Sequence, residues 1–135
     1  MNQQLNSPPS RSDEFSAPVV VSMTRVYPGP NLAPDQDGPP ERLTAILQAV
    51  AGLIETQGGL IGHIKACLNL GSAGGVALSL VGKSISCKTL PEDPETLQDS
   101  IKIALTAIIY GLTEKRLTDF LAYELDQAFE IPAKI

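Results

Sequence analysis

Three side chains that can do chemistry stand at alternate positions in one short segment, namely His63, Lys65 and Cys67. His63 is the only histidine in the chain, so an acid–base or metal role that needs imidazole must use it. In a strand, alternate residues project from the same face, where they can hold a metal ion or an acidic partner. A tetrahedral metal site needs four matched ligands, however, and Cys67 and Cys87 lack the C-x-x-C spacing of zinc and thiol redox sites. We treat the three side chains as a speculative polar site and expect no metal and no cofactor.

The other reactive side chains form no catalytic pattern, and we expect no catalytic residue. The glycine-rich loop 71–75 lacks the spacing of a P-loop and the Lys and Ser/Thr that follow one. Ser79, Ser84 and Ser86 have no G-x-S-x-G context, and one histidine cannot be placed beside any of them from the sequence. The absence of a catalytic constellation favours a non-enzymatic protein.

Composition predicts one small cytoplasmic domain. The chain has 135 residues, 43% of them hydrophobic, which suffices for one core. A net charge of −5 argues against a nucleic-acid binder, whose affinity comes from Lys and Arg. The polar N-terminal residues lack the apolar region of a secretory signal, and the longest apolar stretch, 104–112, is far shorter than the ~20 residues that cross a bilayer.

Charge is distributed unevenly along the chain. Residues 41–90 carry four basic and two acidic side chains, whereas residues 91–135 carry four basic and nine acidic ones. Complementary regions can favour head-to-tail contact between copies, although a solvated acidic helix face explains the same pattern.

Residues 1–40 are expected to be an extended or disordered proline-rich arm, because eight of the eleven prolines precede Glu41. A strand-like island at 19–27 interrupts the arm and can pair with its own domain, with a second copy or with another protein by strand addition. We assign partner binding to its apolar residues, which are Val19, Val20, Val21, Met23, Val26 and Tyr27.

Residues 41–130 are expected to fold as a single α+β domain, followed by a tail at 131–135. Apolar residues at spacings of three and four predict a helix that opens at Pro39, Pro40 and Glu41 and stops at Gly58, and a second helix capped by Thr113. Alternating residues predict one strand from Leu60 and a second from Val76. The apolar positions of the second strand change parity at Ile85 and Cys87, which we interpret as a bulge at Gly82 or a bend of the strand near Lys83. An acidic turn around Asp93 predicts a short helix.

The segment 101–112 fits both helical and strand periodicity, and we favour the strand because β-branched residues are dense there. Both of its faces are apolar, which indicates either burial under the two helices or a subunit interface. The expected interface residues are Ile101, Ile103, Leu105, Ile108, Ile109 and Tyr110.

The sequence thus predicts a small antiparallel sheet in helix-strand-strand-strand-helix order, with flanking helices and an N-terminal arm. Our leading functional hypothesis is a non-enzymatic accessory or scaffolding subunit that self-associates and binds a larger protein complex through its arm. The alternative is a small ligand- or metal-binding domain or enzyme, with a site around His63, Lys65 and Cys67 that is completed at an oligomer interface.

Overall fold

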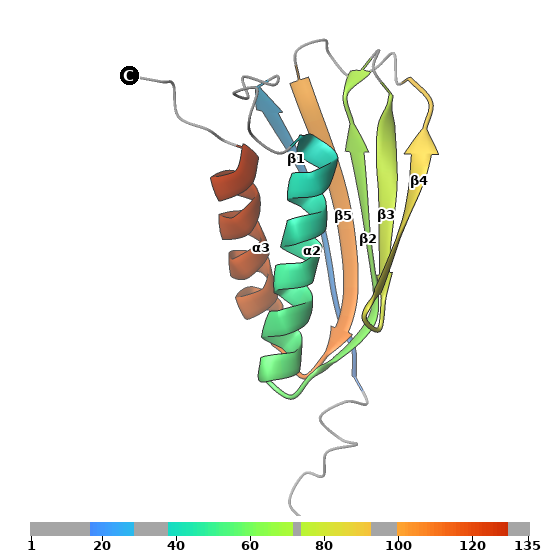
Figure 1. The fold of residues 1–135 in the computed structure, drawn as a ribbon. Helices are drawn as coiled ribbons and strands as arrows, with labels where there is room; N and C mark the ends of the chain where they lie inside the picture. Colours follow the sequence, from blue (N-terminus) through green and yellow to red (C-terminus); the bar gives the residue numbers. More distant parts are fainter. Residues whose placement is uncertain (1–16, 29–37, 72–73, 93–99, 130–135) are drawn as a thin grey trace, which may run out of the picture.

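Five strands and two helices form the part of the chain that the computed structural model describes, which is residues 17–28, 38–71, 74–92 and 100–129. In chain order they are β1 (Val19–Pro28), α2 (Pro39–Thr56), β2 (Leu60–Asn69), β3 (Gly75–Val81), β4 (Ser84–Leu90), β5 (Ser100–Tyr110) and α3 (Glu114–Phe129). The strands make one antiparallel sheet in the order β1-β5-β2-β3-β4, and both helices lie on the same face of it (Figure 1). The predicted α+β class is confirmed.

Both predicted helices are confirmed, together with the signals that begin them and the glycine that ends α2. Prolines occupy the first turn of α2, where their missing N–H groups cost no helical hydrogen bond, and Gly58 follows its end with a φ of 77°. Helix α3 is capped by the Thr113 hydroxyl, which accepts a hydrogen bond of 3.1 Å from the backbone N–H of Arg116. The apolar stripe of each helix faces the sheet and is buried.

The core lies between the helices and the sheet, and β5, which pairs with β1 on one side and β2 on the other, contributes a row of buried residues to it. Ile101, Ile103, Leu105 and Ile109 are each at most 2% exposed beneath the helices. Alternation along β5 is regular, so the prediction of a strand at this segment is confirmed. Since four of the six expected interface residues are core residues, simple burial explains most of the apolar character of this segment.

The strand-like island is an edge strand, β1, of the same sheet, which adds a strand before α2 to the predicted order and is one of the three pairings that the sequence left open. It pairs with β5 from Val19 to Pro28, so the strand-like island joins its own domain. Its Val21 and Tyr27 are 4% exposed and belong to the core, and they are therefore not available to a partner as we had expected. Of the expected arm and tail, residues 1–16, 29–37 and 131–135 lie outside the described residues, as does the short helix predicted at Asp93.

The predicted order is wrong after β2, where one expected strand is two. Gly82 and Lys83 form a two-residue turn between β3 and β4, with Val81 paired to Ser84 and Gly82 at a φ of 62°. Residues that pair across such a turn differ by an odd number in the sequence, so one face of the hairpin takes even-numbered residues from one strand and odd-numbered residues from the other. We had interpreted this change as a bulge or a bend within one strand. The bulge of this sheet lies instead at Gly62, between Ile61 and His63.

Contacts near the end of α3 hold the two helices and the edge strand β1 together. The Tyr27 hydroxyl donates a hydrogen bond of 2.8 Å to the Asp126 carboxylate, and its ring stacks on Phe129 with centroids 5.7 Å apart. The Arg42 guanidinium of α2 donates to the backbone carbonyl of Ala128. No helix in the described ranges is long and apolar enough to cross a membrane.

Candidate functional site: the open face of the sheet

The face of the sheet that points away from α2 and α3, here called the open face, has no covering element among the described residues (Figure 1). Strand register assigns the side chains of this face. They are Val20, Ser22, Thr24 and Val26 of β1; Lys102, Ala104, Thr106, Ile108 and Tyr110 of β5; Leu60, His63, Lys65, Cys67 and Asn69 of β2; Ala77, Ser79 and Val81 of β3; and Ser84, Ser86, Lys88 and Leu90 of β4.

The predicted polar site lies on this face, on the strand at its centre. His63, Lys65 and Cys67 follow one another at alternate positions of β2, with His63 and Lys65 exposed and Cys67 half-buried. Register places Lys65 between Thr106 of β5 and Ser79 of β3, neighbours that can donate and accept hydrogen bonds but carry no charge. The strand therefore presents an imidazole, an amine and a thiol in one row.

The described residues bring no metal-binding group together around this row. No cluster of three or more His, Cys, Asp or Glu side chains occurs in the described ranges. Cys87 lies on the opposite side of the sheet from Cys67, since it pairs with the core residue Leu78, and both thiols are free. A metal site built on His63, Lys65 and Cys67 needs further ligands from outside the described residues.

Exposed aliphatic side chains concentrate on the open face. Val20, Val26, Leu60 and Val81 are each 54 to 62% exposed and all belong to it. The other large hydrophobic residue that is exposed in the described part of the chain, Tyr123, lies on α3. Two of the six residues predicted to bind a partner, Val20 and Val26, are thus exposed, and two predicted interface residues, Ile108 and Tyr110, are half-buried on the same face.

Charge on the open face is of one sign. None of the five strands contains Asp or Glu, and Lys65, Lys88 and Lys102 all project from this face. These three lysines form no ion pair with a described residue. Their ammonium groups are therefore neutralised by no side chain in the described part of the protein.

The two remaining lysines of the described residues differ from these three, because each has an acidic partner. Lys83 Nζ lies 3.2 Å from Glu55 Oε2, and Lys115 Nζ lies 2.9 Å from Asp119 Oδ2 on α3. The hydrogen bond that Lys115 donates to Asp119, together with the negative charge of that carboxylate, raises the pKa of Lys115. Unpaired lysines of the described chain are therefore confined to the open face.

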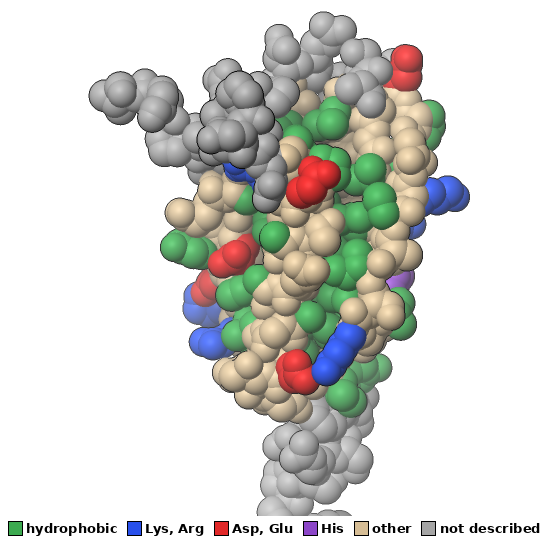
Figure 2. All heavy atoms as spheres, viewed as in Figure 1, with side chains coloured by type: hydrophobic (Ala, Val, Ile, Leu, Met, Phe, Trp, Pro, Cys, Tyr) green, Lys and Arg blue, Asp and Glu red, His purple; other side chains and the backbone are tan. Residues whose placement is uncertain are grey.

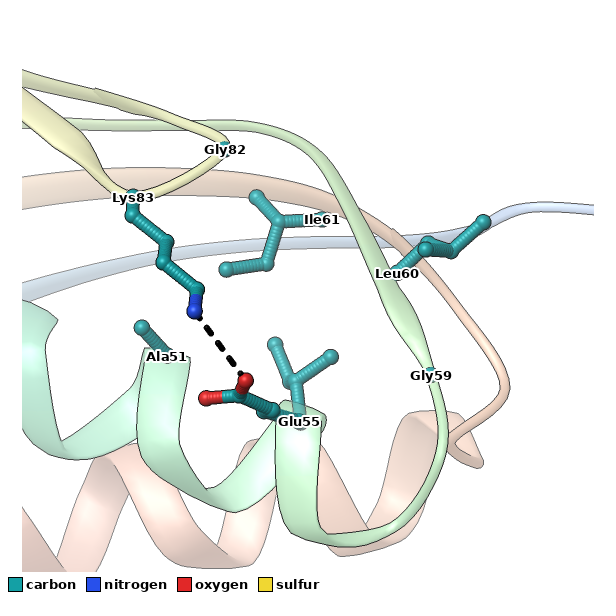
Figure 3. A pocket seen from close by; sticks show the side chains of 8 residues that line it. Ala51, Glu55, Gly59, Leu60, Ile61, Gly82 and Lys83 are labelled. Carbon is teal, nitrogen blue, oxygen red and sulfur yellow. Dashed lines mark ion pairs between the residues drawn. The ribbon is translucent and has the colours of Figure 1, made fainter.

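A shallow hollow lies on the helix side, at the end of α2 (Figure 3). It has a volume of about 220 Å³ between α2, the start of β2 and the β3–β4 turn, and Ala51, Ile54 and Ile61 supply apolar walls. The ion pair between Glu55 and Lys83 spans its mouth, and both side chains are largely exposed. The hollow can seat a small apolar group, and its two charged lining residues, Glu55 and Lys83, are paired with each other.

The helix side is otherwise mixed in character. Hydrophobic side chains gather between α2 and the neighbouring strands, and both acidic and basic side chains are visible over the helices (Figure 2). On this side of β4, Ile85 is half-buried and Cys87 and Thr89 are exposed, so the outer strand is less covered than the centre of the sheet.

Sequence reasoning missed Lys88 and Lys102 as site residues. The alternation of each strand places its lysine on the same face as the residues two positions before and after it. The absence of acidic residues from 60 to 90 was also visible in the sequence. The missing information was strand order, which brings β5 beside β2 and so collects three lysines from three strands on one surface.

Comparisons with known proteins find little similarity. No family model matches the chain, and no curated protein matches it. Among solved structures, the chain is similar to the crystal structure of the Zn(II)-bound YjiA GTPase from E. coli, with 12% sequence identity and a TM-score of 0.48. The match covers 77% of this chain and 29% of that chain, so this protein spans less than a third of that GTPase structure.

Proposed function

We propose that this protein is a non-enzymatic accessory or scaffolding subunit that docks onto other protein chains through the open face of its sheet. One observation carries the proposal: within the described part of the chain, a five-stranded face has no covering element and holds four exposed aliphatic residues and three lysines without an ion pair. Exposed apolar side chains that lie near one another can mark an interaction site, and Val20, Leu60 and Val81 lie toward the same end of this face.

The docking surface proposed here differs from the one expected from the sequence. One edge of β1 pairs with β5, and its Val21 and Tyr27 are buried in the core. The strand therefore contributes to docking through Val20 and Val26. Attachment to a larger complex through residues 1–16 remains part of the proposal, and its test is a chain that lacks residues 1–16. A deletion of residues 1–40 is unsuitable, because it removes an integral strand.

The experiment compares proteins that co-purify with the tagged full-length chain and with a Val20→Ser/Val26→Ser variant. A partner that the wild-type chain retains should be lost by this variant, since serine removes exposed aliphatic surface without disturbing the core. Lys83→Gln is the control, because it changes an exposed side chain on the opposite side of the sheet. Equal recovery of every partner by all three proteins would contradict docking through the open face.

A second candidate, a ligand- or metal-binding domain or enzyme, rests on the shared position of His63, Lys65 and Cys67 on the open face. A metal ion such as Zn²⁺, or a small molecule, should then raise the melting temperature of the wild-type protein and leave that of His63→Ala and Lys65→Ala unchanged. The same stabilisation in all three proteins would exclude this site.

A further inference from the structure

We infer that the occupant of the open face is the helix layer of a second copy of this chain, which stacks the protein head to tail. The helix layer is the outward surface of α2 and α3. This inference rests on the proposed function and names the partner of the same face. Its basis is that the two faces of the protein carry opposite charge.

The helix layer is acidic where the open face is basic. Helices α2 and α3 contain six acidic and three basic residues, a formal net charge of −3. The open face carries three lysines and no acid. Glu41, Glu114 and Glu124 of the helix layer form no ion pair with a described residue, so unpaired carboxylates and unpaired ammonium groups lie on opposite sides of one molecule.

The carboxylates of the helix layer and the lysines of the open face are each spread over their surface, so the electrostatic attraction does not act at one point only. Contact of Arg42 with Ala128 brings the start of α2 to the end of α3, which places Glu41 and Glu124 near one end of the helix layer, whereas Glu114 lies at the other. Lys65 and Lys102 stand on adjacent strands four pairing positions apart, about 14 Å between backbones.

The two surfaces are also similar in size. Helix α3, with 16 residues, is about 24 Å long, and five strands of seven or more residues make a face of about 24 Å in each direction. Burial of such a face covers about 600 Å² on each partner, at the lower end of specific interfaces. A weak and salt-sensitive association is expected.

Charge argues against the symmetric alternative, in which two open faces pack on each other. That arrangement brings three lysines against three lysines with no acid between them, and it desolvates Lys65 at the centre of the face. Single-stranded nucleic acid is also disfavoured, because Tyr110 is the one Phe, Tyr or Trp on the face and bases need aromatic platforms. Sheet-on-helix contact is heterologous, so it leaves a free face at each end and allows further copies to add.

The first experiment is sedimentation velocity of the full-length protein from about 10 µM to about 1 mM in about 50 mM NaCl. The mass should rise with concentration beyond that of a dimer, and the association should weaken at least about tenfold in about 500 mM NaCl, where charges are screened within a few ångströms. A protein that stays at its monomer mass of 14.3 kDa throughout would overturn the inference.

The second experiment compares two variants of equal net charge. Lys65→Gln/Lys102→Gln removes open-face charge and should weaken association about tenfold or more. Lys83→Gln/Lys115→Gln makes the same change in net charge on the helix side, where it frees the carboxylates of Glu55 and Asp119, so it should leave association unchanged or strengthen it. An equal effect of both pairs would show a response to net charge alone and would overturn the inference.

The third experiment mixes two defective proteins. A Glu114→Gln/Glu124→Gln variant has an impaired helix layer and an intact open face, the reverse of Lys65→Gln/Lys102→Gln. Each alone should associate poorly, and an equimolar mixture should form a 1:1 dimer that grows no further, because it contains one intact pair of surfaces. Failure to form this dimer would overturn head-to-tail stacking.

Failure of this inference is distinguishable from failure of the proposed function. A monomeric wild-type protein that still loses a different co-purifying protein through Val20→Ser/Val26→Ser would refute stacking of copies and leave docking through the open face intact. Binding of single-stranded DNA at about 150 mM NaCl, lost in Lys65→Gln/Lys102→Gln, would assign the face to nucleic acid and refute both.

Discussion

The hydrogen bond from Tyr27 to Asp126 provides a direct test of whether residues 19–28 belong to the folded domain in solution. Tyr27→Phe removes the hydroxyl donor and keeps the ring that stacks on Phe129. A hydrogen bond to a charged group contributes about 1.5 to 3 kcal/mol. Asp126 is half-buried and water can replace part of the contact, so we expect a loss of about 1 to 1.5 kcal/mol.

Tyr27→Ala should cost more, because the ring itself is 4% exposed and packs into the core. Truncation of a large buried aromatic residue typically costs about 3 to 5 kcal/mol. Tyr123→Phe is the matched control, since Tyr123 is 62% exposed and the same atom is removed; its stability should stay within about 0.5 kcal/mol of the wild type.

The measurement is urea unfolding followed by far-ultraviolet circular dichroism, at high salt so that association does not contribute. A cost below about 0.3 kcal/mol for Tyr27→Phe, together with a cost below about 1 kcal/mol for Tyr27→Ala, would refute the docking of β1 on β5 and α3. Residues 19–28 would then behave as the arm that the sequence had indicated.

Substitution by alanine should change the stability in opposite directions at two glycines, and thermal unfolding measures both changes. At Gly75, a Cβ would fall inside van der Waals contact of the backbone carbonyl oxygen of Leu68, so Gly75→Ala should destabilise by at least about 2 kcal/mol, and an unchanged melting temperature would contradict the β2–β3 register. At Gly52, in the exposed face of α2, a Cβ meets nothing within 4 Å, so Gly52→Ala should stabilise by up to about 1 kcal/mol. A loss of stability there would mean that the face of α2 around Gly52 is covered.

Local pattern sufficed for the elements whose signals lie within them. Helices α2 and α3 carry a stripe of period 3.6 and their own start signals, which are two prolines in the first turn of α2 and Thr113 before α3. Strand β5 carries an alternation that its β-branched residues decide in favour of a strand. These features depend on neighbouring residues only, and each was predicted.

Features that depend on distant partners were not predicted. The strand at Val19–Pro28 looks like a separate island because its partner, β5, follows some seventy residues later. The parity change near Gly82 looked like a bulge because a tight turn and a bulge both shift alternation by one residue. The bulge at Gly62 left no such sign, since Leu60 and Gly62 continue an apparent alternation that the structure breaks.

The candidate site was predicted only in part, because some of its residues are neighbours on one strand and others are brought there by distant strands. His63, Lys65 and Cys67 are neighbours on one strand, so their common face follows from strand periodicity. Lys88 and Lys102 join them only through strand order, and no local rule predicts that β5 lies between β1 and β2. Opposite charge on the two faces of the protein becomes visible only with that order.

The pairing of the first strand with the last also sets an order of events during synthesis. Partners in β1 and β5 lie 72 to 90 residues apart, so β1 leaves the ribosome well before the strand that it requires. At 5 to 20 residues per second, translation imposes a delay of about 4 to 18 s. Helix α2 and the β2–β3–β4 meander can form during that interval, but β5 is the hub that joins them to β1, so the sheet closes only after its synthesis. Until then the valine-rich β1 segment is without the strand that it pairs with, and its apolar side chains are open to contacts with other chains.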